Sequence, residues 1–379
     1  LKAGTKVTLF ERESSLAFHQ SGNNSGVLHS GISYPVGSLK SKLCIDGYQQ
    51  MIKYCSDNQV HFSLCGKYLF ANSSHQFDYL KALHERAKTI GLKGARIVKE
   101  SELKLNVPEL VAKKALWIPQ TGVVDYRTVC ESLARSIEEM GGVIKLNSKV
   151  DSIQDNLGLL VIDKAEYKFD HIIIAAGNKT LSLSSNKALN NKYKLLSIKG
   201  EYYTTSIPRG IEYCLYPLPD PNLPFLGLHC HPDQNGIIEV GPTAIICKDE
   251  YQFDKSYITL DNVIPFLQYK EVRKMVYKNI SFTIDQIFLR FSYKYFSRQV
   301  GDFLNISNPK WVYKRSGIRA QVVDNSGDLI NDFKIHHVFN STYLVNVPSP
   351  AATASLAIAD FIITKNDQKD ERNNTVRTV

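Results

Sequence analysis

Three features are missing from this chain of 379 residues, and each absence narrows what the protein can be. The seven cysteines are scattered without a Cys-x-x-Cys pair, which argues against a disulfide framework and favours reduced thiols in a cytoplasm-like compartment. No apolar run approaches the roughly 18 residues that cross a bilayer. No compact Arg/Lys patch or recognition motif marks a nucleic-acid partner. The net charge of +9 therefore suits a small anionic substrate or an anionic membrane surface.

The beginning of the chain carries a pattern that bears on the fold class. Residues 6–10 alternate like a strand and end on Glu11, as the second strand of a dinucleotide-binding unit does when its acid binds ribose hydroxyls. The Gly-x-Gly-x-x-Gly turn of such a unit is absent from the chain. We expect that turn and its strand upstream of Leu1, over roughly 30 residues, the length of a βαβ unit. The other interpretation is an ordinary α/β strand with a solvated glutamate.

The length and the pattern of elements predict an α/β (α+β mixed) protein with two interwoven domains. Residues 38–57, 75–90 and 126–140 have helical patterns, and a last helix follows Pro350. The run 170–177 is apolar and suits a central parallel strand buried on both faces. Short alternating segments over 198–243, with a hairpin turn at Asn235-Gly236, predict an antiparallel sheet.

These patterns divide the chain between a Rossmann-like cofactor domain that lacks its first strand and an antiparallel-sheet substrate domain. The cofactor domain takes residues 1–66, 122–195 and 312–365, and the substrate domain takes 67–121 and 196–311. Residues 251–311 are helical, aromatic and basic, and the charged tail 366–379 is expected to be disordered.

Three segments carry chemistry. Residues 19–31 form a Gly/Ser/Asn-rich loop whose backbone can approach a planar cofactor closely. Residues 315–321 place two arginines around a glycine, a pattern that suits a carboxylate. Residues 346–356 run from a proline-rich loop into a helix whose N-terminal dipole stabilises an anion. Each segment alone also has a purely structural interpretation. The first is then a plain loop, the second a surface turn with solvated arginines, and the third a close helix–strand contact.

Together with the strand ending in Glu11, these segments resemble the D-amino-acid-oxidase-like superfamily of FAD-dependent oxidoreductases. Within it the chain is most similar to the L-2-hydroxyglutarate dehydrogenase/oxidase family. The matching strings occur in order at 24–31, 37–44, 121–127, 225–229, 317–321 and 348–353. Lys199 stands where that family usually has arginine.

The resemblance implies FAD as the cofactor and oxidation of L-2-hydroxyglutarate to 2-oxoglutarate by hydride transfer to flavin. It implies that a set of residues spread over the chain holds FAD: Glu11, Asn24, Ser25, Gly26, Val27, Val150, Gly177, Gly317, Pro350, Ala351, Ala352 and Thr353.

For the substrate, a small dicarboxylate, Arg319 is the expected ligand of the α-carboxylate, with Lys199, Arg315 and Tyr202 as further candidates. The base that takes the hydroxyl proton is His229 or His29, because a near-neutral imidazole suits that role. His229 and His231 share a strand face, but without a nearby Cys pair or carboxylate at ligand spacing we expect no metal.

Other functions stay open at this stage. Another small anionic substrate, such as an amino acid or glycerol 3-phosphate, fits the same residues. Without the glycine turn, a flavin-free fragment or binding module is the alternative of another class. The aromatic and basic stretch 288–298 could contact an anionic membrane and pass electrons to a quinone, or form a core-packed amphipathic helix. The expected location is the cytoplasm, peripheral to the inner membrane, or the mitochondrion in a eukaryote.

Overall fold

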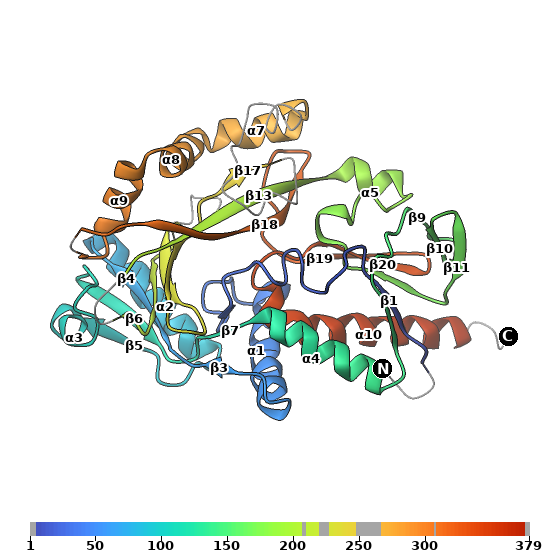
Figure 1. The fold of residues 1–379 in the computed structure, drawn as a ribbon, viewed down its shortest axis with the longest axis horizontal. Helices are drawn as coiled ribbons and strands as arrows, with labels where there is room; N and C mark the ends of the chain where they lie inside the picture. The colour runs from blue at the N-terminus through green and yellow to red at the C-terminus, as the bar shows by residue number, and fades with distance from the viewer. Residues whose placement is uncertain (1–4, 207–209, 220–226, 248–266, 307, 376–379) are drawn as a thin grey trace.

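A computed structural model describes residues 5–206, 210–219, 227–247, 267–306 and 308–375 (Figure 1). Two long paired strands, β13 and β18, run across the molecule, and α7, α8 and α9 lie along its upper edge in this view. One half is built on a nine-stranded sheet in the order β17-β13-β16-β15-β14-β4-β6-β5, with β18 paired to β13. The other half contains smaller sheets and the helices α1, α4 and α10.

The strands of the large sheet come from distant parts of the chain. They are β4 (Lys67–Ala71), β5 (Arg96–Lys99), β6 (Lys114–Ile118), β13 (Tyr193–Thr204), β14 (Cys214–Pro217), β15 (His229–Pro232), β16 (Ile238–Gly241), β17 (Ile245–Ile246) and β18 (Val312–Asp324). The accompanying helices are α2 (Ser74–Thr89), α3 (Glu100–Asn106), α5 (Lys187–Lys192), α7 (Lys270–Lys278), α8 (Ile280–Phe291) and α9 (Tyr293–Gly301).

Alternation along these strands gives the sheet two different faces. One face, here called the apolar face, packs Phe70, Leu215 and Val240 against Leu289 of α8 and Phe296 of α9. The opposite face, here called the polar face, carries the side chains of Lys67, Tyr216, His229, His231, Tyr202, Arg315 and Arg319. Because successive side chains on a strand point to opposite faces, these functional groups share the polar face, whose β4, β6 and β14 part also packs a second hydrophobic cluster against Leu80 and Leu83 of α2.

The second half of the molecule contains short parallel pairs. β1 (Thr8–Phe10) pairs with β8 (Val143–Lys145), and β12 (Ile172–Ile174) pairs with β20 (Ser341–Asn346). The remaining elements are β2 (Val27–Leu28), β3 (Phe62–Ser63), β7 (Gly122–Val124), β9 (Ser152–Gln154), β10 (Leu159–Ile162), β11 (Ala165–Lys168), β19 (Lys334–Val338), the short η1 (Gly177–Lys179), α1 (Leu39–Asp57), α4 (Tyr126–Glu139) and α10 (Ala351–Thr375).

The predicted helices are confirmed at α1, α2 and α4, and α10 begins after Pro350 as expected. The caps explain two of these starts: Ser38 Oγ accepts the N–H of Ser41 at 3.1 Å, and Asp125 Oδ1 accepts the N–H of Arg127 at 2.8 Å. The prediction for the end of α10 was too short, because the helix continues to Thr375 rather than stopping at 365. Residues 376–379, like 1–4, 225–226 and 251–266, lie outside the described residues.

The expectation for residues 170–177 was right about direction and wrong about position. β12 is parallel to β20. Within the described residues, however, β12 stands at the end of a three-stranded sheet, and Ile173 is 51% exposed. An apolar run predicts that a strand forms, but it does not predict which strands pair with it in the sheet. Among the described residues no helix has the length and hydropathy that crossing a membrane requires.

Candidate active site

The register of β13 and β18 brings three of the predicted site residues onto the polar face. Tyr202 lies opposite Arg315, and Ile198 lies opposite Arg319, four residues further along β18. Directly paired residues share a face, so both arginines and Tyr202 point the same way. Arg319 is partly buried, and burial lowers the pKa of its guanidinium while the phenols of Tyr202 and Tyr34 counteract that shift. The group remains a cation, because arginine is not deprotonated in proteins.

His229 is fixed by two contacts on the same face. Its ring stacks on Tyr216 with centroids 4.0 Å apart and an interplanar angle of 26°. Nδ1 lies 3.1 Å from the carbonyl oxygen of Gly227, which accepts the Nδ1 proton and leaves Nε2 as the basic nitrogen. Burial, with His231, His29 and Arg319 nearby, holds the pKa of His229 well below its usual range. The imidazole is therefore a neutral proton acceptor in a desolvated environment.

His29 reaches the same region from the N-terminal loop. Its Nε2 lies 3.3 Å from Ser349 Oγ. Burial, with Lys67 and Lys40 nearby, lowers the pKa of His29 to about 3. His29 also contributes to the lowered pKa of His229.

A hydrogen-bond network around Thr353 joins this loop to the start of α10. Thr353 Oγ1 donates to the carbonyl of Val27 at 3.2 Å and accepts the backbone N–H of His29 at 3.2 Å. The hydroxyl of Tyr126 lies 3.0 Å from the same oxygen and donates to it. The loop and the proline-led helix, which are more than 300 residues apart in sequence, therefore form one unit.

The remaining predicted cofactor residues of the loop have local structural roles that the sequence did not show. Asn24 Oδ1 accepts the N–H of Gly26 at 2.8 Å, which forms a tight turn with Gly26 at φ +70°. The Ser25 side chain lies within hydrogen-bonding reach of Tyr202. A Cβ atom on Gly317 would lie 1.9 Å from the carbonyl oxygen of Asn23. This close backbone approach explains why residue 317 is glycine.

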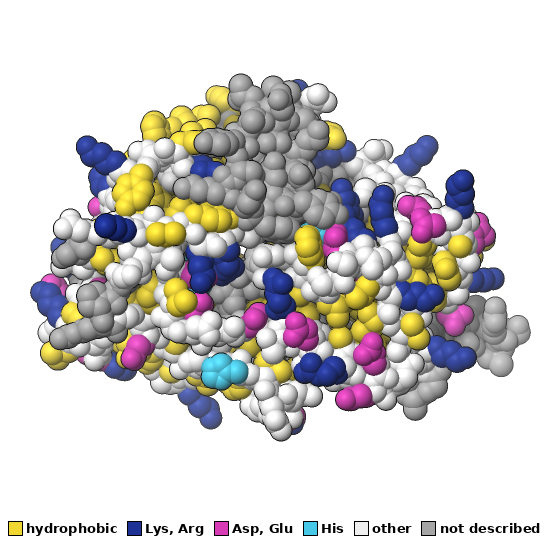
Figure 2. Space-filling view, viewed as in Figure 1, with side chains coloured by type: hydrophobic (Ala, Val, Ile, Leu, Met, Phe, Trp, Pro, Cys, Tyr) yellow, Lys and Arg dark blue, Asp and Glu magenta, His cyan; other side chains and the backbone are white. Residues whose placement is uncertain are grey.

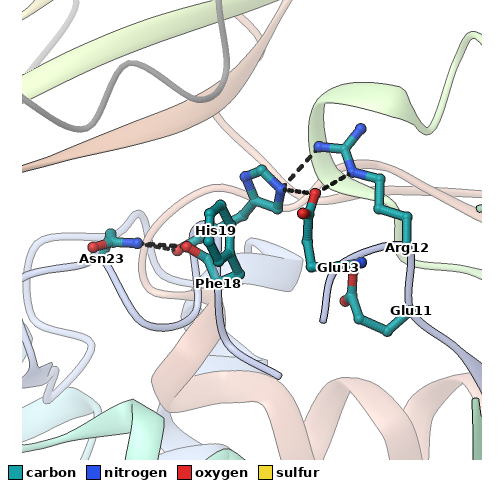
Figure 3. Close-up of polar contacts among 6 residues, drawn as sticks. All are labelled: Glu11, Arg12, Glu13, Phe18, His19 and Asn23. Atoms are coloured by element: carbon teal, nitrogen blue, oxygen red, sulfur yellow. Dashed lines mark hydrogen bonds and ion pairs between the residues drawn. The ribbon is translucent and has the colours of Figure 1, made fainter. Parts of the chain in front are cut away.

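A cavity of about 2400 Å³ lies beside the loop, and three predicted cofactor residues line it: Glu11, Val150 and Gly177. Figure 3 shows the chain that follows β1: Glu11 Oε1 accepts the N–H of Glu13 at 3.0 Å, and His19 Nε2 lies 2.8 Å from Glu13 Oε1. Arg12 Nε donates to the same Glu13 oxygen at 2.8 Å. An acid that ends a strand beside a large cavity is where a ribose is held in a dinucleotide site.

The cavity is large enough for FAD, and Glu11, Val150 and Gly177 line it. The other predicted cofactor residues, in the loop 24–27, at Gly317 and at the start of α10, are not among the residues that line it. The N-terminal dipole of that helix favours negative charge. His229 and Arg319 are not among the residues lining this cavity. The cofactor residues and the polar face meet at the loop 24–29.

Two predicted substrate residues have other partners. Lys199 lies on the apolar face, because it is three positions from Tyr202 on one strand; its Nζ is 3.8 Å from Glu201 Oε1. Arg290 of α8 forms a second ion pair with the same oxygen at 2.9 Å, so Glu201 is bound by two buried cations. The guanidinium of Arg315 forms a two-point ion pair with Glu239 and donates to the carbonyl of Asn24 at 2.6 Å. Both predicted cations are therefore paired with carboxylates of the protein itself.

Sequence reasoning missed Lys67, Tyr216 and Ser349. Tyr216 could have been found, since it alternates with Leu215 on a strand next to the one that carries His229. Ser349 lies in the 346–356 segment that the sequence singled out, but its contact with His29 was not predictable. Lys67 gave no signal, because only the tertiary structure brings it to the polar face. Among the described residues, no three His, Cys, Asp or Glu side chains gather as metal ligands.

Comparisons with known proteins agree with this geometry. A family model described as DAO, FAD dependent oxidoreductase, matches residues 1–363. The L-2-hydroxyglutarate dehydrogenase of Indibacter alkaliphilus is 34% identical, over 94% of this chain and 91% of that protein. The mitochondrial L-2-hydroxyglutarate dehydrogenase of Caenorhabditis elegans is 32% identical, over 95% and 87%. The Escherichia coli K12 L-2-hydroxyglutarate dehydrogenase is 28% identical, over 95% and 86%.

Solved structures are similar in fold. The L-alpha-glycerophosphate oxidase of Mycoplasma pneumoniae with FAD bound has a TM-score of 0.69 at 20% identity, covering 93% of this chain and 86% of that one. The glycine oxidase of Geobacillus kaustophilus has a TM-score of 0.66 at 15% identity, covering 94% and 87%.

Proposed function

Because this chain belongs to the DAO family of FAD-dependent oxidoreductases, we propose that it oxidises L-2-hydroxyglutarate to 2-oxoglutarate. When bound, FAD accepts the hydride that leaves the hydroxyl-bearing carbon. Relatives that share 28–34% identity over nearly their whole length carry the name L-2-hydroxyglutarate dehydrogenase. An amino acid or glycerol 3-phosphate as substrate and a flavin-free binding module are not favoured.

The observation that carries this proposal is the joining of three elements. The Thr353 network ties the 24–29 loop to the start of α10, and that loop packs against the polar face that holds His229 and Arg319. A hydroxy acid bound there has a base and a carboxylate ligand on one side and the cofactor loop on the other.

The roles follow from charge and protonation. Arg319 binds the α-carboxylate, since the planar guanidinium matches a carboxylate in a two-point contact. His229 Nε2 accepts the hydroxyl proton, because its Nδ1 proton is committed to Gly227. His29, which contributes to the lowered pKa of His229, is the alternative base. Tyr202, whose ring lies 4.6 Å from Cζ of Arg315, is a further candidate for the substrate.

The test is anaerobic reduction of the purified, FAD-containing protein. We expect the flavin absorbance to bleach with L-2-hydroxyglutarate and to stay unchanged with D-2-hydroxyglutarate or glycine. His229→Gln is expected to keep the flavin and lose at least about 100-fold in reduction rate, as general-base removal does. Bleaching by glycine or glycerol 3-phosphate, with no response to L-2-hydroxyglutarate, contradicts the proposed substrate.

We also propose that α8 rests on an anionic membrane, where a quinone would accept the electrons. Ile280, Ile284, Ile287 and Phe291 form one stripe on this helix and are 51%, 46%, 48% and 59% exposed. Figure 2 shows hydrophobic side chains gathered over α8 and α9 at the upper left. Leu289 and Phe296 are buried, so the segment has the core-packed side of an amphipathic helix as well as the exposed side that a membrane contact requires.

Lysines flank this stripe: Lys278 precedes α8 and Lys294 follows it. Such a helix lies in the membrane interface with its apolar face down. Cosedimentation with phosphatidylglycerol-containing vesicles at low salt should capture the protein, and Ile284→Glu with Ile287→Glu should release it. Failure of the unaltered protein to bind at low salt overturns this part. We propose accordingly a location at the cytoplasmic side of the inner membrane, or in the mitochondrion of a eukaryote; the Caenorhabditis elegans relative is named as mitochondrial.

A further inference from the structure

Lys67 is a buried lysine without an acidic partner. Only 4% of the residue is exposed, at the start of β4 on the polar face. Among the described residues it forms no ion pair. Its Nζ lies 5.2 Å from the centroid of the Tyr216 ring, and the thiols nearest to it are Cys44, Cys65 and Cys214.

This arrangement is costly without an anion. A buried ammonium loses its hydration and is tolerated only when paired or hydrogen-bonded. The face of the Tyr216 ring attracts the Lys67 ammonium only weakly. It offers no lone pair to accept any of the three N–H hydrogen bonds that the ammonium can donate. Burial accordingly lowers the pKa of Lys67 in the free protein. A carboxylate brought to this position supplies the missing charge.

Further polar atoms on the same face also lack partners. Tyr216 Oη and His231 Nε2 are buried and form no hydrogen bond within the part of the chain that is described. Their rings are linked through His229, which stacks on Tyr216 at 4.0 Å and lies 5.8 Å from His231. Buried polar atoms without partners are rare in native proteins and gather where a ligand belongs.

Lys67 lies at the opposite end of this group from Arg319. Between β4 and β18 the sheet order contains β14, β15, β16 and β13, and His229 is on β15, in the middle. Lys67 and Lys40 contribute to the lowered pKa of His29, and His29 and Arg319 contribute to that of His229. The strand that carries His229 therefore lies between the strands of the two cations.

We propose that Lys67 binds the second carboxylate of the substrate, so that the site selects 2-hydroxy dicarboxylates over 2-hydroxy monocarboxylates. This inference rests on the proposed function, in which Arg319 binds the first carboxylate and His229 faces the hydroxyl. A monocarboxylate of the same length leaves Lys67 desolvated and unpaired. Sites built to pair a polar group reject analogues that lack it far more strongly than apolar pockets reject a missing methylene.

The experiment measures binding of two dead-end ligands to the oxidised holoenzyme, by calorimetry or by perturbation of the flavin spectrum. Glutarate has both carboxylates, and pentanoate has one on the same five-carbon chain. We expect the unaltered protein to bind glutarate at least about 100-fold more tightly, the size expected for a desolvated charge pair. Equal binding of the two ligands overturns the proposal without any variant.

Variants then assign the preference to Lys67. Lys67→Met should reduce it to a few-fold with flavin content retained, and Lys67→Arg, which keeps the charge, should preserve most of it. Lys114→Met is the matched control, because Lys114 lies on the same sheet, 4.3 Å over the ring of Phe77, and away from the histidines. A glutarate preference that survives Lys67→Met in folded, flavin-containing protein refutes the role of Lys67.

The steady-state experiment separates this proposal from the proposed function. The ratio of kcat/KM for L-2-hydroxyglutarate to that for L-2-hydroxypentanoate should collapse in Lys67→Met and stay unchanged in Lys114→Met. If the protein prefers glutarate through Lys67 but does not oxidise L-2-hydroxyglutarate, the substrate assignment fails and the carboxylate site stands. If the protein oxidises L-2-hydroxyglutarate but Lys67→Met does not change its preference for dicarboxylates, the proposed function stands and the role of Lys67 fails.

Discussion

Thr353→Val tests whether one hydroxyl holds the cofactor loop to α10. The side chain is fully buried, and valine has nearly the same shape, so the packing is preserved while the hydroxyl is lost. The substitution removes the three hydrogen bonds that Thr353 Oγ1 makes with Val27, His29 and Tyr126. It leaves a carbonyl, an N–H and a phenol without their partner in a buried position.

The expected loss follows from the count of bonds. Each neutral hydrogen bond contributes about 0.5 to 1.5 kcal/mol, so three give a fall of about 1.5 to 4.5 kcal/mol in the free energy of unfolding. If part of this free energy is lost by local opening of the 24–29 loop, without unfolding of the protein, FAD affinity falls tenfold for each 1.4 kcal/mol. We expect Thr353→Val to purify with much less flavin than the unaltered protein.

The assay combines urea unfolding with fluorescence titration of FAD into the apoprotein. Thr353→Ser is the matched control, since it keeps the hydroxyl and loses one methyl group, and it should retain FAD affinity within a few-fold. If Thr353→Val binds FAD and unfolds like the unaltered protein, the loop and the helix are not held together by this network.

Three further outcomes follow from contacts described above. Glu201→Gln leaves two buried cations without their carboxylate and should lower the free energy of unfolding by about 3 to 5 kcal/mol in urea melts; an unchanged melt would show that the ion cluster is not stabilising. Gly317→Ala puts a Cβ atom 1.9 Å from the Asn23 carbonyl and should cost about 1 to 3 kcal/mol together with flavin, measured as flavin-to-protein ratio. The pKa values of His29 and His229 are lowered in the folded protein, to about 3 for His29, so the unfolded chain binds protons first as the pH falls below 6.5. Stability should therefore decrease from pH 6.5 towards 3, by up to about 1.4 kcal/mol per pH unit for each histidine, and His229→Gln should flatten the slope of Tm against pH.

Local features of the sequence predicted the helices well, because caps and periodicity act over a few residues. Ser38 and Asp125 marked the starts of α1 and α4. The position of Lys199 could have been anticipated, since a spacing of three on a strand puts it on the opposite face from Tyr202. The partner of Arg315 was not predictable, since Glu239 comes from another strand and only the strand order brings it within reach.

The substrate side of the site was the least visible. Lys67 is the one charged residue of an otherwise apolar strand, and in a sequence such a lysine usually predicts a solvated position at the strand end. In the structure Lys67 is buried against the ring of Tyr216. The resemblance located Arg319 and the Thr353 helix, because both belong to strings of matching residues. A single lysine without such a string leaves no comparable trace.

Strand β13 begins with Tyr193 in the apolar cluster beside the cofactor cavity and reaches Tyr203 in the core behind the polar face, paired to β18 along its length. This continuous two-stranded ribbon connects the part of the molecule that lines the cofactor cavity to the part that carries the polar face. Selectivity among 2-hydroxy acids then depends on whether both ends of the acid can bind to the polar face at the same time.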